Sequence, residues 1–493
     1  MKTGSFRLLL IIAIIIGVVI RLLVIIPYQP EHGAVLQAAM AKGFMKTGEF
    51  TMQYGLIFEF ENLNPAPSQH FPPFYPYLIA IHAGTPDFNL DILKSLSLRL
   101  AFITTLFIFL LTRKSFGYIS ALFTTSVWIL HAAMIDNASK CLSENLQIIT
   151  IISFLSLFFQ SREKPWMLLP AGFALGLAYL TKSTLPFFGT IFVILIAVIV
   201  LCGSNTKLIP WATAGFVAFV AVILPWGFRN YTLFGTFDTS PYIDSTINAF
   251  LSHPLYFFTG LAKNALPMFS VIAVPFFLFF SEIRKARISD PGDFLLLFFS
   301  MGVFILSLFY ATSFYVSEGA FLPVNSMRYS LLTFVPLIWL ILKHIDWDTQ
   351  SAKLRAQVAV YIALCSAISI LFIAVIQIDK PLINEMDIAL SKKTVSVLNE
   401  KEITPPFKVG FIKEINKNDF YYYLFALEKE FGAISDIQLG YIDNLESPEI
   451  LISSPGVKIP NGYHRYKIVD EIIKPHKTWE SQEHVIYLRN DYR

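Results

Sequence analysis

The stretch RLLLIIAIIIGVVIRLLVIIP (7–27) decides the class of fold, because only Arg7 and Arg21 in it are charged. A helix needs about 20 apolar residues to cross the hydrocarbon core of a bilayer. The apolar core is long and no small-x-small cleavage site follows it, so we expect a retained membrane anchor rather than a signal peptide. Arg21 either extends outward to the interface or faces a helix bundle, and the cost of an intramembrane charge favours the bundle.

The charge distribution extends this interpretation to most of the chain. The 493 residues are 55% apolar and 15% charged, whereas soluble proteins carry about 25% charged residues. Residues 379–493 hold about 29% charged residues and residues 1–378 only about 11%. We therefore predict an α-helical polytopic membrane domain over 1–378 and a small soluble α/β domain over 379–493. This composition excludes a disordered chain and a soluble globular body.

Further apolar runs predict about eleven membrane spans in total. They are 7–27, 96–112, 118–135, 145–160, 166–181, 184–202, 208–226, 267–283, 293–313, 328–343 and 356–378. With the N-terminus in the cytoplasm, basic residues near helix ends gather in the inner loops, as the positive-inside rule requires. These residues are Lys2, Arg7, Arg113, Lys114, Arg162, Lys164, Lys207, Arg284, Lys285, Arg287, Lys343, Lys353 and Arg355. The sequence therefore predicts a plasma-membrane protein whose C-terminal domain is extracytoplasmic.

Two regions outside the spans have predicted structure. The first outer loop, 28–95, contains a helix-like stretch at 31–46. It also contains PPFYPYLIAIHAG (72–84), which is too short to span and is interpreted as a re-entrant or interfacial helix. In the tail, 407–412, 449–454 and 484–490 are predicted strands, and 418–432 is a predicted helix.

Several function classes are excluded or disfavoured. A net charge of +3 is too small to suggest a nucleic-acid partner. The three cysteines form no metal or disulfide framework. A Gly-rich nucleotide loop is absent from the sequence, which argues against a cytosolic nucleotide-sugar donor.

Polar residues gather where this topology places the outer ends of the helices. They are Glu31, His32, Gln69, His70, Asp136, Lys140, Glu144, Lys182, Arg229, Asn230, Arg328 and Tyr329. A basic residue at such an end can simply extend toward lipid phosphates, and Glu31 alone can be a solvated loop acid. Lys182, Arg229 and Arg328 nevertheless lie on the outer side, against the positive-inside rule. Binding of an anion would explain why they are there.

The chemistry that fits these residues is transfer from a lipid-linked phosphate. Lys182, Arg229 and Arg328 are suited to hold a phosphodiester and to stabilise the charge that its phosphate gains as it leaves. An acceptor hydroxyl is a weak nucleophile and needs a carboxylate base, for which Glu31 is the candidate. No metal-ligand set is predicted, although Glu31 and Glu144 could share a divalent ion, so a metal requirement stays open.

Local motifs in a fixed order point to a known family. They are QPEHGAVLQAAMAKGFMKTGEF (29–50), HFPPFYP (70–76), SKCLSENL (139–146), LGLAYLTKST (175–184), PWGFRNYTLFGTF (225–237) and NSMRYSLLTFVP (325–336). Over residues 1 to about 345 the chain resembles the GT-C membrane glycosyltransferases. The resemblance is to the branch of protein O-mannosyltransferases and lipid A aminoarabinose transferases. It implies a polyprenyl-phosphate sugar donor bound from the outer leaflet and a protein, lipid or glycan acceptor.

The resemblance also implies roles for individual residues. Glu31 would be the general base, at a position where family members usually have Asp. Glu144 would be the acid of the second outer loop, with Asp136 as the competing candidate. The donor phosphate would be held by Lys182, Arg229 and Arg328, with His70 as a further candidate. The donor or acceptor pocket would include Asn230, Tyr231, Tyr329 and Tyr75.

Two other classes of function remain open. One is a transporter or flippase of a lipid-linked saccharide, although no internal repeat is visible, and transporters commonly have one. The other is a polymerase or ligase that joins glycan blocks from a pyrophosphate-linked lipid. This second alternative keeps the topology and changes the donor.

Overall fold

The computed structural model describes most of the helical part of the chain and the strands of the tail. The described residues are 3–25, 30, 32–52, 66–68, 71–182, 206–237, 250–251, 253–287, 289–318, 330–345, 347, 352–378, 393–403, 407–411, 437–441, 450–453, 463–469 and 484–489. The chain divides into two compact units. The first comprises Met1–Tyr28, Gln69–Tyr75 and Leu96–Val375, and the second comprises Gln29–Ser68, Pro76–Ser95 and Ile376–Arg493.

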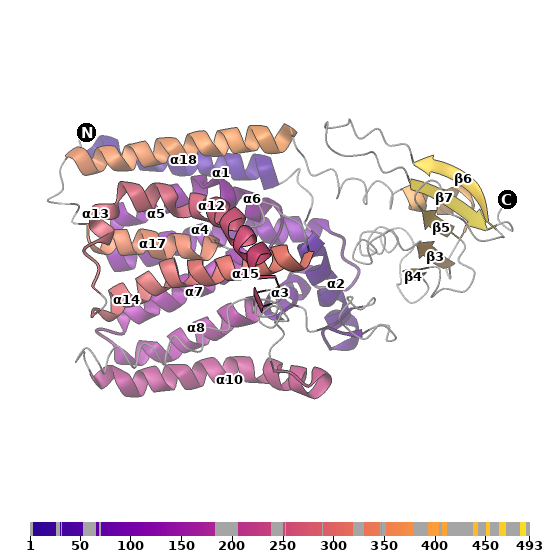
Figure 1. Cartoon of the computed structure of the whole chain (residues 1–493), viewed down its shortest axis with the longest axis horizontal. Helices are drawn as coiled ribbons and strands as arrows, with labels where there is room; N and C mark the ends of the chain where they lie inside the picture. Colours follow the sequence, from indigo (N-terminus) through magenta and orange to yellow (C-terminus); the bar gives the residue numbers. More distant parts are fainter. Residues whose placement is uncertain are drawn as a thin grey trace. The chain divides into compact units, whose positions relative to one another are not determined.

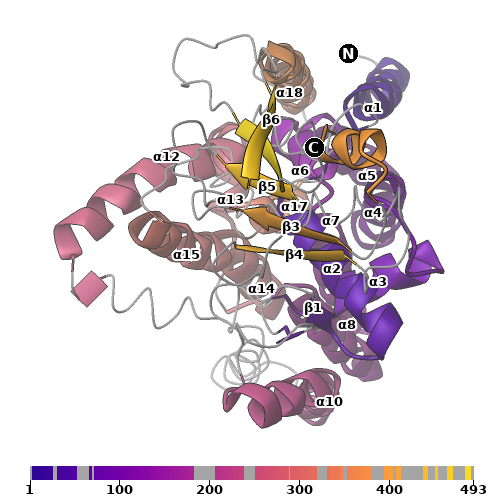
Figure 2. The ribbon, with the colours of Figure 1, turned by 90° about the vertical axis from the view of Figure 1, so that its right-hand side faces the viewer.

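The first unit is a bundle of apolar helices (Figure 1). Its α-helices are α1 (Thr3–Ile25), α4 (Asp91–Phe116), α5 (Tyr118–Leu130), α6 (Ala132–Ser139), α7 (Glu144–Gln160), α8 (Leu168–Thr181), α10 (Ile209–Phe234), α12 (Pro254–Leu278), α13 (Phe280–Ile283), α14 (Pro291–Leu297), α15 (Val303–Glu318), α17 (Leu331–Lys343) and α18 (Ala352–Ile378). Short 3-10 turns η1 (Pro165–Met167) and η2 (Thr206–Leu208) precede α8 and α10, and the π-helical turn η3 (Phe298–Gly302) joins α14 to α15. Figures 1 and 2 both place α1 and α18 at one edge of the bundle and α10 at the opposite edge.

These helices make the chain an integral membrane protein. Among the described residues, six helices are long and apolar enough to cross a membrane, or seven if α5 and α6 form one bent span. Each predicted span overlaps a described helix except 184–202, which lies outside the described residues. The predicted number of eleven is therefore not confirmed, because α7, η1–α8 and α17 are shorter apolar helices.

The span predicted over 118–135 is not one straight helix. Helix α5 ends at Leu130, α6 begins at Ala132, and the two axes differ by 59°. His131 between them has extended backbone angles, φ −73° and ψ 122°. The break lacks the proline or glycine that usually marks one in a sequence, so side chains from elsewhere must stabilise it.

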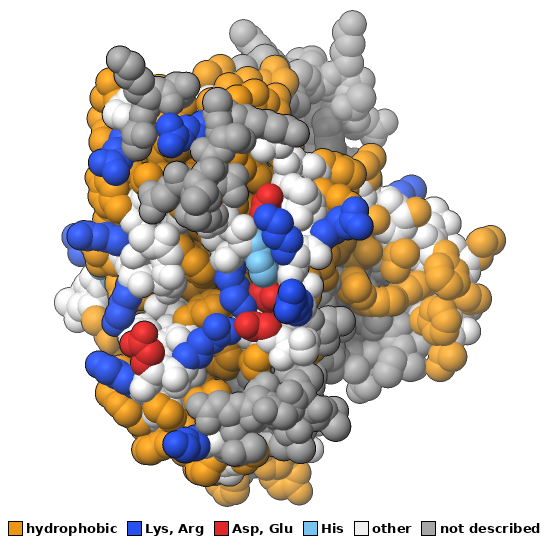
Figure 3. Space-filling view, turned by 90° about the vertical axis from the view of Figure 1, so that its left-hand side faces the viewer, with side chains coloured by type: hydrophobic (Ala, Val, Ile, Leu, Met, Phe, Trp, Pro, Cys, Tyr) orange, Lys and Arg blue, Asp and Glu red, His pale blue; other side chains and the backbone are white. Residues whose placement is uncertain are grey.

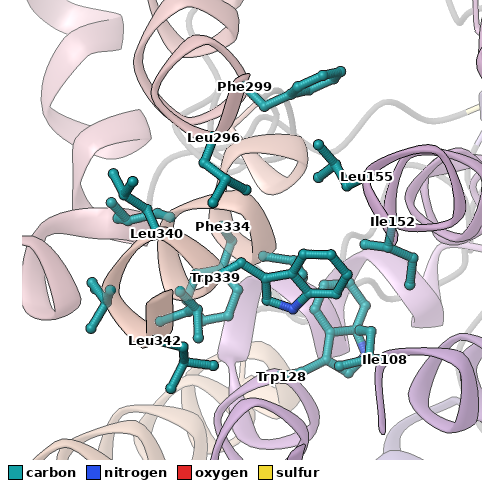
Figure 4. Packing of buried hydrophobic residues seen from close by; sticks show 14 of the residues in the cluster. Ile108, Trp128, Ile152, Leu155, Leu296, Phe299, Phe334, Trp339, Leu340 and Leu342 are labelled. Carbon is teal, nitrogen blue, oxygen red and sulfur yellow. The ribbon is translucent and has the colours of Figure 1, made fainter. Parts of the chain in front are cut away.

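The bundle core is apolar and aromatic. Trp128, Trp339 and Phe334 are fully buried and pack among aliphatic side chains of neighbouring helices (Figure 4). The indole of Trp339 donates a 2.8 Å hydrogen bond to the hydroxyl of Thr112, which satisfies its polar atom inside the core. Helices α8 and α10 approach closely, because a Cβ added at Gly172 would lie 1.9 Å from the Gly215 carbonyl oxygen. Small residues commonly allow such contacts between membrane helices.

One end of the bundle carries many basic side chains. Figure 3 views the end at which Figure 1 places the N-terminus, and shows Lys and Arg around acidic and His side chains. The side chain of Arg162 pairs with Asp290 at 2.8 Å, and Lys343 pairs with Asp290 at 2.7 Å and Asp293 at 2.6 Å. These ion pairs join three loops that the charge rule assigns to the same side. They therefore agree with the predicted alternation of the helices.

The carboxyl of Asp290 is shaped by this network. Burial acts to raise its pKa, but the hydrogen bond from Lys343, the backbone N–H of Asp293 and the charge of Arg162 together lower it from 3.8 to about 2. The same carboxyl caps α14 by accepting bonds from the N–H groups of Gly292 and Asp293 at 2.7 and 3.0 Å. Asp290 thus joins helix capping to the loop network.

The second unit contains the predicted helix of the first outer loop and the sheet of the tail. Helix α2 (His32–Thr47) confirms the helix predicted at 31–46, and α3 (Phe74–Ala83) is a short helix within 72–84. Strands β1 (Thr51–Met52) and β2 (Ala66–Pro67) form an antiparallel pair. With ten residues, α3 is too short to span, as predicted.

The tail forms a five-stranded mixed sheet of order β4-β3-β5-β7-β6, whose strands are labelled in Figure 1. Strands β3 (Phe407–Phe411), β5 (Ile450–Ser453) and β7 (His484–Arg489) match the three predicted strands, whereas β4 (Ile437–Tyr441) and β6 (Tyr463–Val469) were not predicted. Strand β3 is parallel to β4 and β5, and β7 is antiparallel to β5 and β6. The predicted helix 418–432 lies outside the described residues.

Candidate functional site

A buried ion pair joins the start of α7 to the end of α8. The Lys182 ammonium donates to the Glu144 carboxylate, and the Glu144 side chain is only 2% exposed while that of Lys182 is 19% exposed. Lys182 follows the last residue of α8 with extended angles, φ −158° and ψ 108°, so its side chain leaves the helical path there. The amide Nε2 of Gln147 donates to the Lys182 carbonyl oxygen at 3.3 Å. Glu144 and Gln147, one helical turn apart, thus hold both the side chain and the backbone of Lys182.

This pair has the properties of a functional site in a membrane bundle. A carboxylate in the first turn of a helix is favoured by the positive end of the helix dipole. Burying two charges nevertheless costs more than an apolar pair of the same size in many proteins. Ionisable residues inside membrane bundles therefore mark a functional site by default. The sequence predicted both residues for the outer face and did not predict that they pair.

The competing acid, Asp136, has a different partner. Its carboxylate pairs with Lys140 at 2.9 Å, one turn later in the chain, and both side chains are largely buried. The Ser139 hydroxyl donates to the Asp136 carbonyl oxygen at 2.7 Å. Asp136 thus forms a local pair at the end of α6, while Glu144 links two helices. The contrast favours Glu144 over Asp136 for a role that involves Lys182.

The turn between these two acids is anchored from two sides. The Tyr75 hydroxyl, from the proline motif, donates to the Cys141 carbonyl oxygen at 2.7 Å. The Ser97 hydroxyl of α4 donates to the Ala138 carbonyl oxygen at 2.6 Å. Cys141 has a φ of 61°, a left-handed conformation that is uncommon outside glycine. The Tyr75 ring is fully buried. In this structure Tyr75 therefore supports the turn and offers no surface to a sugar.

Three further candidates lie together near the end of α10. The Arg229 guanidinium lies 4.7 Å from the ring centre of Trp226, and its Nη1 donates to Asn230 Oδ1 at 3.1 Å. Asn230 is fully buried, whereas Tyr231 is exposed and stacks on Phe237 with ring centres 5.0 Å apart. A cation in the last turns of a helix is favoured by the helix dipole.

The remaining candidates, Glu31, His70, Arg328 and Tyr329, lie outside the described residues. The structure brings Lys182 to Glu144 and Arg229 to Trp226, and the predicted convergence of Lys182, Arg229 and Arg328 stays a prediction. Within the described ranges, no three His, Cys, Asp or Glu side chains gather as a metal site.

Gln147 is a polar residue of the site that the sequence pattern did not indicate. Its Oε1 atom is buried with no hydrogen-bond partner in the part of the chain that the structure describes. A polar residue one turn after Glu144, in a helix whose residues from Ile148 to Phe159 are apolar or carry only a small hydroxyl group, was the available signal.

No protein-family model and no curated protein sequence matches the chain, but solved structures do. The crystal structure of ArnT from Cupriavidus metallidurans bound to undecaprenyl phosphate matches with a TM-score of 0.63 at 11% identity. The match covers 100% of this chain and 99% of that one. The apo state of the same ArnT matches with a TM-score of 0.56 at 14% identity, covering 90% of this chain and 92% of that one.

A second neighbour is the oligosaccharyltransferase AglB from Archaeoglobus fulgidus in complex with an inhibitory peptide and a dolichol-phosphate. It matches with a TM-score of 0.56 at 12% identity, covering 91% of this chain and 69% of that one. At such low identities the likeness concerns the fold. The chain therefore shares its fold with ArnT, an aminoarabinose transferase of the kind that its motifs resemble, and with this oligosaccharyltransferase.

Proposed function

We propose that this protein is an integral-membrane glycosyltransferase that transfers a sugar from a polyprenyl-phosphate donor to an acceptor at the outer face of the membrane. The observation that carries the proposal is the match over the full length to ArnT, whose structure was solved with undecaprenyl phosphate bound. A similar fold alone does not define an activity. The proposal therefore also depends on the polar residues of the bundle.

The Glu144–Lys182 pair supplies the local support. Its cation lies where α8 ends, at the same end of the bundle as the turn that follows α6 (Figure 1). In the absence of donor the carboxylate of Glu144 neutralises this cation. A donor phosphate, itself an anion, would compete for Lys182 and form charge-assisted hydrogen bonds with it.

The proposed reaction is an inverting displacement. The acceptor hydroxyl oxygen forms a bond to the anomeric carbon, and the bond between that carbon and the phosphate oxygen breaks. The electron pair of the broken bond remains on the phosphate, which leaves as polyprenyl phosphate, and the acceptor proton passes to a carboxylate base. Cations fixed beside the phosphate stabilise the charge that it gains in the transition state.

In this proposal Glu31 is the base, and Lys182, Arg229 and Arg328 hold the phosphate, with His70 as a further ligand. Glu144 positions Lys182, and Asp136 is the alternative acid. Asn230, Tyr231 and Tyr329 contribute to the donor or acceptor pocket. A divalent metal is not required by this scheme, because phosphate-sugar transfer can proceed with basic residues alone.

The proposed orientation places the N-terminus and the basic end of Figure 3 in the cytoplasm. Residues 379–493 then lie outside the cell. Cysteine substitutions at positions 286 and 430, labelled in intact cells with a membrane-impermeant reagent, test this orientation. Labelling at 430 alone agrees with it, and labelling at 286 alone contradicts it.

The function is tested with the purified protein in proteoliposomes and a radiolabelled polyprenyl-phosphate hexose. Transfer of label to a protein, lipid or glycan acceptor supports the proposal. Movement of the intact donor across the bilayer without transfer would instead identify a flippase. Transfer only from a pyrophosphate-linked donor would identify a polymerase or ligase.

A further inference from the structure

The break between α5 and α6 leaves three backbone carbonyls without their helical partners. In a continuous helix the oxygens of Trp128, Ile129 and Leu130 would accept bonds from residues four positions later. Here the Trp128 oxygen accepts a 3.3 Å bond from the N–H of His131, which is a tighter turn than an α-helix makes. Inside a membrane protein, such carbonyls must find partners within the protein, because lipid offers none.

Arg21 supplies donors to two of the three. Its Nη2 donates to the Trp128 oxygen at 3.0 Å and its Nε to the Ile129 oxygen at 3.2 Å. The guanidinium also lies 5.8 Å from the ring centre of Trp128. The side chain is fully buried, so the first span carries its charge into the bundle rather than to the interface.

Ser369 and His131 make the remaining hydrogen bonds at the break. The Ser369 hydroxyl, from α18, donates to the Leu130 oxygen. His131 caps α6, since its Nδ1 accepts from the N–H of Ala133 at 3.3 Å. Its Nε2 lies 3.1 Å from the Val271 oxygen, and a carbonyl can only accept, so Nε2 carries the proton. Both ring nitrogens are thus used in one consistent tautomer.

These contacts explain why a helix without proline or glycine bends by 59° at this point. Sharp kinks arise at proline, at small residues, at π-bulges, or where a side chain enters the ladder of backbone bonds. Arg21 is the side chain that enters this ladder. An arginine buried in a bundle is costly, and the described residues place no carboxylate within ion-pair distance of it.

The bend directs α6 toward the acidic turn. Helix α6 carries Asp136, and it is followed by the short segment that contains Cys141 and ends at Glu144, where α7 begins. Only four residues separate the end of α6 from α7. The direction of α6 therefore fixes where the Glu144 carboxylate meets Lys182.

We propose that Arg21 is a positioning residue for the proposed site. By donating to the carbonyls of Trp128 and Ile129 it holds the α5–α6 break, and the break holds the turn that presents Glu144 to Lys182. The effect on sugar transfer depends on the proposed function, whereas the effect on the turn does not. The two are therefore measured separately.

The position of the turn is measured through the native thiol of Cys141, which is fully buried. In a Cys202→Ser, Cys365→Ser background this thiol is the sole cysteine, and its rate of modification by N-ethylmaleimide in nanodiscs reports opening of the turn. Arg21→Met removes the donors while keeping a long side chain. Unsatisfied buried carbonyls are costly enough that we expect about 10-fold faster labelling, with slower transfer and a higher donor KM because Lys182 loses its positioning partner. Arg21→Lys retains a donor of sufficient length and should restore both.

The control is Arg7→Met, the same substitution at the exposed end of the same helix, which should leave labelling unchanged. Wild-type labelling in a folded Arg21→Met protein would overturn the proposal, whatever its transfer rate. If Arg21→Met does not yield folded protein, Arg21→Gln decides, because it keeps a polar side chain but removes the guanidinium that donates to both the Trp128 and Ile129 oxygens. Faster labelling of Cys141 in Arg21→Gln supports the proposal, and unchanged labelling overturns it. If neither the wild type nor any variant transfers sugar, the proposed function is contradicted. The labelling result would still hold.

Discussion

Replacing Lys182 by methionine should destabilise the protein strongly, because it removes the ion-pair partner of a carboxylate that is 2% exposed. Removing one partner of a buried ion pair typically costs about 3–5 kcal/mol. Lys182 is 19% exposed, so water screens part of the interaction and we expect the lower end, about 3 kcal/mol. The free energy of unfolding in mixed micelles measures this cost.

The double variant Glu144→Gln, Lys182→Met separates stability from function. It leaves no uncompensated charge, so most of the lost stability should return, since replacing both members of a buried pair is often nearly neutral. Transfer should not return, because the cation that we assign to the donor phosphate is still missing. The two measurements are made on the same preparations.

Lys285→Met is the matched control. Lys285 pairs with Glu282 at the other end of the bundle and is 52% exposed, so its loss should cost well under 1 kcal/mol and leave transfer intact. A double variant with normal transfer would refute a functional role for Glu144 and Lys182. A Lys182→Met protein as stable as the wild type would refute the buried ion pair itself.

Three further predictions concern other residues. Glu31→Gln should lower turnover by at least about 100-fold with little change in donor affinity, and Glu31→Asp should retain some activity, both measured as initial rates against donor concentration. Arg229→Ala should raise the donor KM as well as slow transfer, because a ground-state phosphate ligand is lost; an unchanged KM would argue against that role. The lowered pKa of Asp290 should stabilise the wild type above pH 3.8, and this contribution should disappear as the pH falls toward about 2. The shift corresponds to at most about 2.5 kcal/mol, which screening reduces to about 1 kcal/mol. Asp290→Asn should lack this acid dependence of the free energy of unfolding.

The sequence predicted the strands at the centre of the tail sheet and missed those at its edges. Strands β3, β5 and β7 are flanked on both sides, and their segments FKVGF, ILIS and HVIYLR are rich in apolar residues. The edge strands β4 and β6 have only one neighbour each, and YHRYKIV in β6 carries three basic residues. Edge strands tolerate such charges because they face solvent, so the apolar pattern that identifies a strand is weak there.

The helices followed from their apolar runs, but the break at His131 did not. Helix-breaking signals in a sequence are local, whereas this break depends on Arg21, which precedes Trp128 by 107 residues. The candidate site also depends on contacts between residues far apart in the sequence. The membrane topology predicted from the distribution of basic residues placed Glu144 and Lys182 at one end of the bundle. Their pairing depends on how α7 packs against α8, and an isolated sequence does not give that packing.

The central claim is that the donor is a polyprenyl-phosphate sugar, and the lipid released by the reaction tests it most directly. Purified protein is incubated with donor and acceptor, and the lipid products are identified by mass spectrometry. We predict polyprenyl monophosphate, released in equal amount to the sugar that is transferred and strongly reduced in Lys182→Met. Release of polyprenyl pyrophosphate, or recovery of all donor as the intact sugar-linked lipid under conditions that move it across the bilayer, would contradict the claim.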